Sequence, residues 1–157
     1  MNTQIETSLA VARQRVAQGK LPYAGAVLPA EAWALLSNPE VVLVDVRTSA
    51  ERAWVGKVML EGARHVAVEW NTWPAGTPNP RFVEQLRELV PAAQTEPVLL
   101  FLCRSGVRSR SAAMAATQAG FTHSYDILEG FEGDKDGNGH RKTVAGWCKA
   151  GLPWVGA

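Results

Sequence analysis

The sequence has few cysteines and almost no net charge. Cys103 and Cys148 are its two cysteines among 157 residues. They could form at most one disulfide, far from the density of a small secreted scaffold, and they lack the paired spacing of a zinc site. The formal net charge of +1 gives no basis for binding nucleic acid or an anionic membrane surface. We therefore expect no nucleic-acid partner, no membrane partner, no metal and no other cofactor.

Long apolar runs are also missing. No stretch reaches the run of about 18 apolar residues that a membrane-spanning helix needs. The first residues, MNTQIETSLAVARQRVAQGK, have no basic start followed by a continuous apolar stretch, so they do not resemble a secretory signal. The composition, 46% apolar and 20% charged, is that of an ordinary globular domain. These features predict a soluble cytoplasmic protein with one folded core.

What the sequence does contain is an alternation of strand and helix patterns. Aliphatic runs at 41–46 and 98–102 and the segment SYDIL at 124–128 are typical of buried strands. One helical pattern lies near the N-terminus, with Ile5, Leu9 and Val16 on one face, and a second covers PAEAWALLSN. A third covers NPRFVEQLRELV, with Asn79 as cap and Pro80 at the first helical position. A fourth covers RSRSAAMAATQAG and is ended by Gly120. This succession predicts an α/β fold with a mostly parallel sheet. The Gly-rich tail from Glu129 is expected to wrap, in an ordered conformation, over the edge of the domain.

Cys103 follows the second aliphatic run directly and opens a small basic loop, CRSGVRS. Ligands of open α/β sheets bind beyond the carboxyl ends of the strands, so this thiol stands where a ligand would lie. Gly106 can take a positive φ, and the loop N–H groups, the next helix and the charges of Arg104 and Arg108 all favour a thiolate. A core cysteine would give no reason for these arginines. We therefore interpret Cys103 as a nucleophile.

Several motifs resemble those of the rhodanese-type sulfurtransferase domain. DVRTSAE follows the first aliphatic run, GAR stands where the family usually reads GAI, CRSGVRS follows the second run, and the tail resembles the end of single-domain bacterial and plastid rhodaneses. The resemblance covers about Ala26 to Val155 and departs from the family at GKVMLEGA, where the family usually reads GHIPGA. It implies a rhodanese-like α/β fold, with a five-stranded, mostly parallel sheet and helices on both faces. The chain would divide into an N-terminal helical extension, 1–25, and a rhodanese-like domain, 26–157.

The resemblance also implies a chemistry. Cys103 would take a sulfane sulfur from a small anionic donor such as thiosulfate, hold it as a persulfide and pass it to a thiol, a protein or a cyanide-type acceptor. The residues expected to bind the substrate are Arg104, Ser105, Gly106, Val107, Arg108 and Ser109. Asp45 and Arg47 are expected to form a structural ion pair or a turn contact near the loop and to take no part in the chemistry.

Two other functions stay open on these residues. A cysteine phosphatase needs a similar cysteine, N–H cradle and arginine, but the phosphatases that resemble this fold have five residues between the cysteine and the arginine. Here four residues separate Cys103 from Arg108. A sulfur-relay or partner-binding module without turnover is the second alternative. The presence of the cysteine argues against a wholly inert domain but is compatible with a relay.

Two further features have ordinary interpretations. Segment 134–145 matches the first half of a calcium-binding loop, but its twelfth position is Ala145, where a bidentate glutamate is needed. We interpret the segment as a turn rich in Gly, Asn and Asp. Cys148 lies beside Trp147 in an apolar part of the tail and is interpreted as a packing residue.

Overall fold

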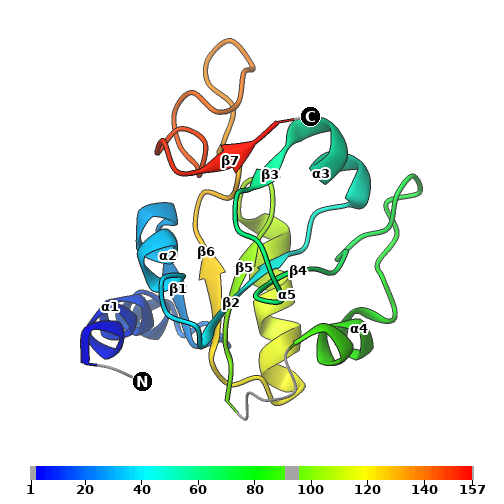
Figure 1. The fold of residues 1–157 in the computed structure, drawn as a ribbon. Helices are drawn as coiled ribbons and strands as arrows, with labels where there is room; N and C mark the ends of the chain where they lie inside the picture. Colours follow the sequence, from blue (N-terminus) through cyan, green and yellow to red (C-terminus); the bar gives the residue numbers. More distant parts are fainter. Residues whose placement is uncertain (1–2, 91–95, 157) are drawn as a thin grey trace.

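The computed structural model describes residues 3–90 and 96–156 (Figure 1). Its elements in chain order are α1 (Thr3–Gly19), β1 (Gly25–Val27), α2 (Pro29–Leu35), β2 (Val41–Asp45), α3 (Ser49–Val55), β3 (Lys57–Val58), β4 (His65–Ala67), α4 (Phe82–Leu89), β5 (Val98–Leu102), α5 (Val107–Gln118), β6 (Ser124–Ile127) and β7 (Trp154–Val155). Five strands form one sheet in the order β1-β6-β5-β2-β4, with every neighbouring pair parallel. β3 and β7 form a separate antiparallel pair.

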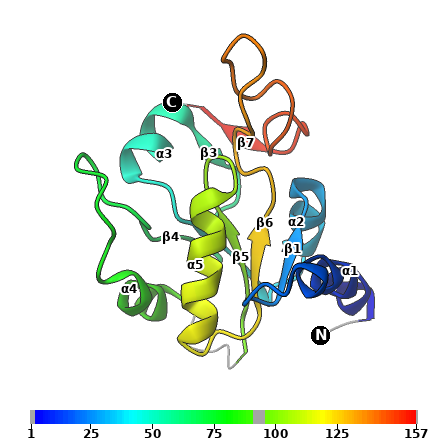
Figure 2. The same ribbon diagram turned by 180° about the vertical axis from the view of Figure 1, so that it is seen from behind.

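Helices cover both faces of the sheet, as Figures 1 and 2 show from opposite sides. Most buried residues of α1 and those of α2 pack in one core cluster with Leu43 and Leu100. The buried residues of α4 and α5 pack in a second cluster with Val44 and Phe101, which also includes Val16 at the end of α1. Successive side chains of a strand point to opposite faces, so β2 and β5 supply both clusters and are buried along their whole length. The predicted α/β fold with a five-stranded sheet and helices on both faces is confirmed.

Local patterns located most of the central elements. The leading helix is present, and its predicted face, Ile5, Leu9 and Val16, is buried. The aliphatic runs form β2 and β5, SYDIL contributes β6, and Gly120 follows α5 with a φ of 104°. Within residues 3–90 and 96–156, no helix combines the length and apolar character needed to cross a bilayer.

The predicted start of α4, the helix expected over NPRFVEQLRELV, is wrong. We expected Asn79 to cap it and Pro80 to be its first residue, but α4 begins at Phe82. Asn79 is engaged with the preceding segment, since its N–H donates to the Trp70 carbonyl and its side-chain amide donates to the Glu69 carbonyl. Its Oδ1 accepts the N–H of Arg81 at 3.0 Å, so it closes a turn ahead of the helix.

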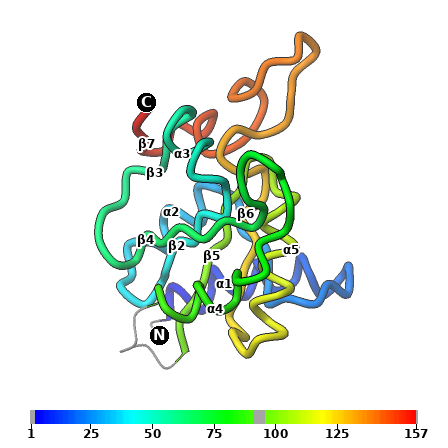
Figure 3. The backbone as a smooth tube through the Cα atoms, turned by 90° about the vertical axis from the view of Figure 1, so that its right-hand side faces the viewer, coloured from blue at the N-terminus to red at the C-terminus, as the bar shows by residue number. Residues whose placement is uncertain are grey.

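The C-terminal tail is ordered and closes over one end of the domain, as predicted (Figure 3). Trp147 is fully buried, its ring meets Trp33 edge to face at a centroid distance of 5.9 Å, and its Nε1 donates to the Pro153 carbonyl. The tail ends in β7, which pairs with β3. Because β3 lies within GKVMLEGA, the segment that departs from the family pattern pairs with the end of the tail.

Removing the Trp147 side chain tests how much the packing of the tail stabilises the domain. We expect Trp147→Ala to lower the free energy of unfolding by about 3–5 kcal/mol, because the tail loses its central buried contact. Trp54 is 81% exposed, so Trp54→Ala should change it by less than about 0.5 kcal/mol. Urea denaturation of both variants gives the comparison, and equal losses would contradict the role assigned to the tail.

Candidate active site

Cys103 lies at the carboxyl end of β5, immediately before the loop that leads into α5. It is only 1% exposed. Gly106 is the residue before the first helical position and has a φ of 105°, as its place in the loop predicts. Its N–H donates to the Cys103 Sγ at 3.0 Å, and it is the one backbone donor to this sulfur among the described residues. The sulfur therefore sits at the N-terminus of α5, where the helix dipole favours negative charge.

The other predicted loop residues have different surroundings. Arg104 and Val107 are exposed, Ser105 and Arg108 are half-buried and Ser109 is buried. The side chain of Arg104 makes no ion pair within the part of the chain that the structure describes. Its backbone carbonyl accepts the N–H groups of Glu132 and Gly133. The loop backbone is thus fixed to the tail while the Arg104 side chain remains on the surface.

A tight turn of the tail packs behind the loop. The Phe131 N–H donates to the Cys103 carbonyl at 2.8 Å. Gly130 has a φ of 70°, and a Cβ added there would overlap the backbone of Arg104 and Ser105. A glycine is therefore required at this position for the tail to approach the loop.

Arg108 is held by an acid from α3. Its Nη1 and Nη2 donate to the two carboxylate oxygens of Glu51 at 2.8 and 2.7 Å. Burial acts to raise the pKa of Glu51, but hydrogen bonds from Arg108 and Thr48 outweigh it and lower that pKa to about 2. The charge of Arg108 is therefore largely balanced within the protein. Sequence reasoning missed Glu51, whose visible signal, the capping box TSAE, indicates only the start of a helix.

A second acid lies behind the sulfur. The Cys103 thiol donates to the Ser109 Oγ at 3.3 Å, and the Ser109 hydroxyl donates to the Asp126 Oδ1 at 2.5 Å. Burial raises the pKa of Asp126 to about 7, against the opposing effects of the Ser109 hydrogen bond and of Arg110. Asp126 was not among the predicted site residues. The signal that could have found it is a single acid inside a segment predicted to be a buried strand.

Asp45 and Arg47 form the predicted structural ion pair. The Arg47 Nη2 lies 2.7 Å from the Asp45 Oδ2, and both side chains are fully buried. Arg47 also donates to the Gly56 carbonyl at 3.0 Å, and its guanidinium lies 4.3 Å from the centre of the Phe131 ring. The pair thus belongs to the scaffold beside the loop.

The remaining sequence features lie outside this site. Cys148 is half-buried against the core, and burial raises the pKa of its thiol to about 11. Asp136 accepts the N–H groups of Asn138 and His140 and the hydroxyl of Thr143, which makes segment 134–145 the expected turn. Among the residues that the structure describes, no group of three or more His, Cys, Asp or Glu side chains could hold a metal ion.

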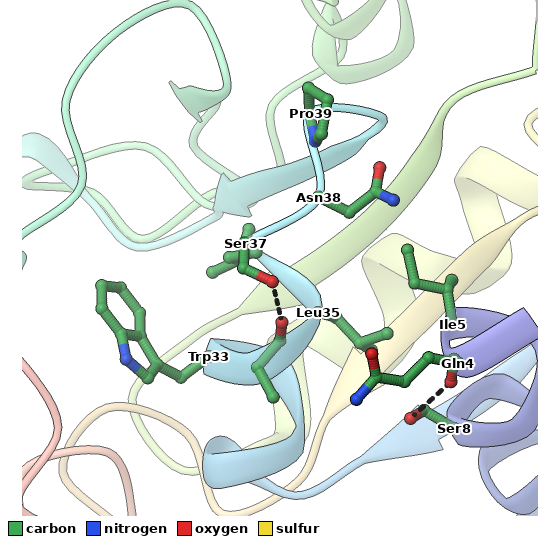
Figure 4. A pocket seen from close by; sticks show the side chains of 10 residues that line it. Gln4, Ile5, Ser8, Trp33, Leu35, Ser37, Asn38 and Pro39 are labelled. Carbon is green, nitrogen blue, oxygen red and sulfur yellow. Dashed lines mark hydrogen bonds between the residues drawn. The ribbon is translucent and has the colours of Figure 1, made fainter. Parts of the chain in front are cut away.

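A cavity of about 560 Å³ lies between α1, α2 and the turn before β2 (Figure 4). Its lining includes Ser8, Trp33 and Asn38. Val41, which opens β2, pairs with Val98, the first residue of β5, whereas Cys103 follows the last residue of that strand. The cavity therefore lies toward the opposite end of the sheet from the cysteine.

Comparison with known proteins identifies the family of this architecture. The model of the rhodanese-like domain family matches residues 28–136. A crystal structure of Rv0390 from M. tuberculosis is 45% identical, with a TM-score of 0.76 and coverage of 86% of this chain and 99% of that chain. A Rhodopseudomonas palustris protein described as a possible tyrosine phosphatase is 22% identical, with a TM-score of 0.53 and coverage of 99% and 96%. The polysulfide-sulfur transferase homodimer from Wolinella succinogenes is 18% identical, with a TM-score of 0.56 and coverage of 98% and 85%. The last two share the fold alone.

The two cysteines should differ in reactivity. With a pKa near 11, the Cys148 thiol stays protonated at neutral pH, whereas Cys103 lies at a helix N-terminus beside a backbone donor. We expect iodoacetamide to modify Cys103 at least about tenfold faster than Cys148 at pH 7.5. Timed alkylation followed by peptide mass mapping measures both rates. Faster labelling of Cys148 would contradict an activated Cys103.

The contact between tail and loop can be tested at Gly130. Gly130→Ala should lower the free energy of unfolding by more than about 1 kcal/mol, because alanine disfavours the positive φ and its Cβ overlaps the loop backbone. Gly137→Ala is the matched control, since a Cβ there would meet nothing within 4 Å. Thermal and urea unfolding of both variants provide the measurement. A Gly130→Ala protein as stable as the control would show that the tail does not constrain the loop.

Proposed function

This chain belongs to the family of rhodanese-like domains, and on that premise we propose that it is a sulfurtransferase that carries a sulfane sulfur on Cys103. The donor is a small anion such as thiosulfate, and the acceptor is a low-molecular-weight or protein thiol or a cyanide-type nucleophile. The observation that carries the proposal is a buried sulfur at the N-terminus of α5 with the Gly106 N–H 3.0 Å away. A cytoplasmic location is part of the proposal, because reducing conditions keep both free cysteines as thiols.

The first step transfers sulfur to the enzyme. The Cys103 thiolate attacks the outer sulfur of thiosulfate, the sulfur–sulfur bond of the donor breaks, and sulfite leaves with the bonding electron pair. A persulfide anion remains on Cys103. The Gly106 N–H and the positive end of the α5 dipole stabilise the negative charge on the thiolate, the incoming donor and the persulfide in turn.

The second step regenerates the thiolate. The acceptor nucleophile attacks the outer sulfur of the persulfide, and Cys103 leaves as the thiolate. Because the covalent intermediate separates donor and acceptor steps, turnover follows ping-pong kinetics. A relay to a protein thiol would use the same two steps, but its second step, transfer to the acceptor, would be slow or would depend on the partner.

The binding residues in this proposal are those of the loop from Arg104 to Ser109, with unequal roles. Arg108 already binds Glu51 through both of its terminal nitrogens, so its charge is largely used within the protein. Arg104 is exposed and makes no ion pair within the described ranges, so we assign the attraction of the anionic donor to it. Val107 is also exposed, and we assign it to the surface that the acceptor contacts.

The same ion pair argues against phosphatase chemistry. A phosphatase arginine must present a bidentate fork to the phosphate oxygens. In this protein the fork of Arg108 is occupied by the Glu51 carboxylate. The four-residue spacing between Cys103 and Arg108 also differs from the five-residue spacing of the phosphatases. Both observations favour a loop that holds one sulfur atom.

Incubation with thiosulfate tests the assignment. We expect the protein to gain the mass of one sulfur atom on the peptide that contains Cys103, and cyanide or excess thiol should remove it. Cys103→Ser should abolish the adduct and the turnover, because a hydroxyl is not ionised at neutral pH and cannot carry a persulfide. Cys148→Ser is the matched control and should retain both. Intact-protein and peptide mass spectrometry give the readout.

Other outcomes select the alternatives. Ready hydrolysis of an aryl phosphate with a trapped phosphocysteine, and no adduct with any sulfane donor, would overturn the sulfurtransferase proposal. A persulfide that forms but is not turned over by cyanide or small thiols would indicate the relay instead.

A further inference from the structure

Asp126 is a buried acid with too few partners for a carboxylate. It is 1% exposed and lies on β6, between β1 and β5 in the sheet. Its Oδ1 accepts the Ser109 hydroxyl, and its Oδ2 is buried with no hydrogen-bond partner among the described residues. An isolated charge is costly in such a place, so the carboxyl is stabilised when it takes up a proton.

The carboxyl is connected to the reactive sulfur. Cys103, Ser109 and Asp126 are all buried, and the Sγ–Oγ and Oγ–Oδ1 distances are 3.3 and 2.5 Å. The three residues come from the end of β5, the first turn of α5 and β6. Phe101 of β5 is aligned with Asp126 in the sheet, so the parallel register places the acid beside the start of the loop.

We infer that Asp126 and Cys103 share one proton through the Ser109 hydroxyl, so that the carboxyl takes the thiol proton when the nucleophile forms. In this step the Cys103 S–H bond breaks as its proton moves to the Ser109 Oγ. The original Ser109 O–H bond breaks as that proton moves to the Asp126 Oδ1. The products are a thiolate, a serine hydroxyl and a carboxylic acid. One negative charge moves from Asp126 to Cys103, and no atom is oxidised or reduced.

The surroundings of the pair allow the charge to reside at either end. Arg110 and Tyr23 are the charged and titratable groups that act on Asp126, and its aligned neighbours on β1 and β5, Ala26 and Phe101, are apolar. At the sulfur end, the Gly106 N–H, the α5 dipole and the charge of Arg108 favour the thiolate. Burial raises the pKa of Asp126 to about 7, so this carboxyl can take up a proton near neutral pH.

A shared proton has a measurable consequence. The first ionisation gives the pair a single negative charge, and the second is opposed by repulsion between thiolate and carboxylate. Asp126 is thus a positioning residue that acts on the nucleophile through Ser109. Its use in sulfur transfer rests on the proposed function, but the coupling itself can be measured without sulfur transfer.

Two titrations test the coupling, both in a Cys148→Ala background. The rate of iodoacetamide alkylation against pH reports the Cys103 thiolate, and the infrared band of a protonated carboxyl, identified by its loss in Asp126→Asn, reports Asp126. We expect both probes to titrate in two steps with the same two midpoints, at least about one pH unit apart. If Asp126 has only a structural role, each probe should titrate in a single step, and the two midpoints should differ.

The variants sharpen the comparison. Asp126→Asn should convert the alkylation profile to a single one-proton step without the upper midpoint, because the neutral amide removes the competing charge. Cys103→Ala should do the same to the carboxyl titration, since coupling between two sites is reciprocal. Ser109→Ala removes the bridging hydroxyl and should narrow the separation of the midpoints. Asp134→Asn, at an exposed aspartate, is the matched control and should leave the alkylation profile unchanged.

An unchanged alkylation profile in Asp126→Asn, or an unchanged carboxyl titration in Cys103→Ala, would overturn the inference. Circular dichroism establishes that each variant is folded. If Asp126→Asn does not fold, the alkylation profile of Ser109→Ala decides, because it needs no assigned carboxyl band: midpoints as far apart as in the parent protein would overturn the inference. If the two shared midpoints are observed but no persulfide forms, only the proposed function is refuted. A persulfide without coupled midpoints would refute the shared proton alone.

Discussion

The buried ion pair between Asp45 and Arg47 holds together the parts of the molecule that surround Cys103. Its two side chains lie 2.7 Å apart without solvent contact, and Arg47 also binds the carbonyl of Gly56 after α3. The Arg47 guanidinium lies over the ring of Phe131, whose N–H donates to the Cys103 carbonyl. A buried charge without its partner is strongly destabilising. Arg47 must therefore keep its contact with Asp45, and this contact fixes the positions of the end of β2, the end of α3 and the tail relative to one another. The loop around the Cys103 sulfur packs against these segments.

Two acids define how much positive charge the loop offers. The helix N-terminus and the arginines favour an anion at Cys103, but Glu51 binds Arg108 and leaves Arg104 as the exposed cation. Asp126, behind the sulfur, adds a carboxyl whose charge competes with the thiolate. This balance leaves the Arg108 guanidinium bound to Glu51 through both terminal nitrogens and not free to pair with the oxygens of a phosphate. It follows from side chains on three different elements, α3, β6 and α5.

The fold alone does not choose the reaction. Structures with this fold include a protein described as a possible tyrosine phosphatase and a polysulfide-sulfur transferase. The shared feature is a parallel sheet whose strand ends converge beside a helix N-terminus, a place that can bind many kinds of anion. Our proposal of sulfur transfer over phosphatase chemistry rests on the four-residue spacing within the loop and on the binding of Arg108 by Glu51.

The sequence by itself determined the central strands β2 and β5, the buried face of α1, and the position of Cys103 and Gly106 between a strand and a helix. These features depend on residues that are neighbours in the chain, where periodicity and backbone preference report burial directly. The local patterns did not locate the short strands β1, β3, β4 and β7, and they placed the start of α4 two residues early, because neighbouring segments override local preference at such positions. Only the tertiary structure joined Glu51 to Arg108, 57 positions away, and Ser109 to Asp126, 17 positions away. Those contacts depend on the register of parallel strands and on the path of the helices between them, and no local pattern in the sequence encodes which strand ends will meet.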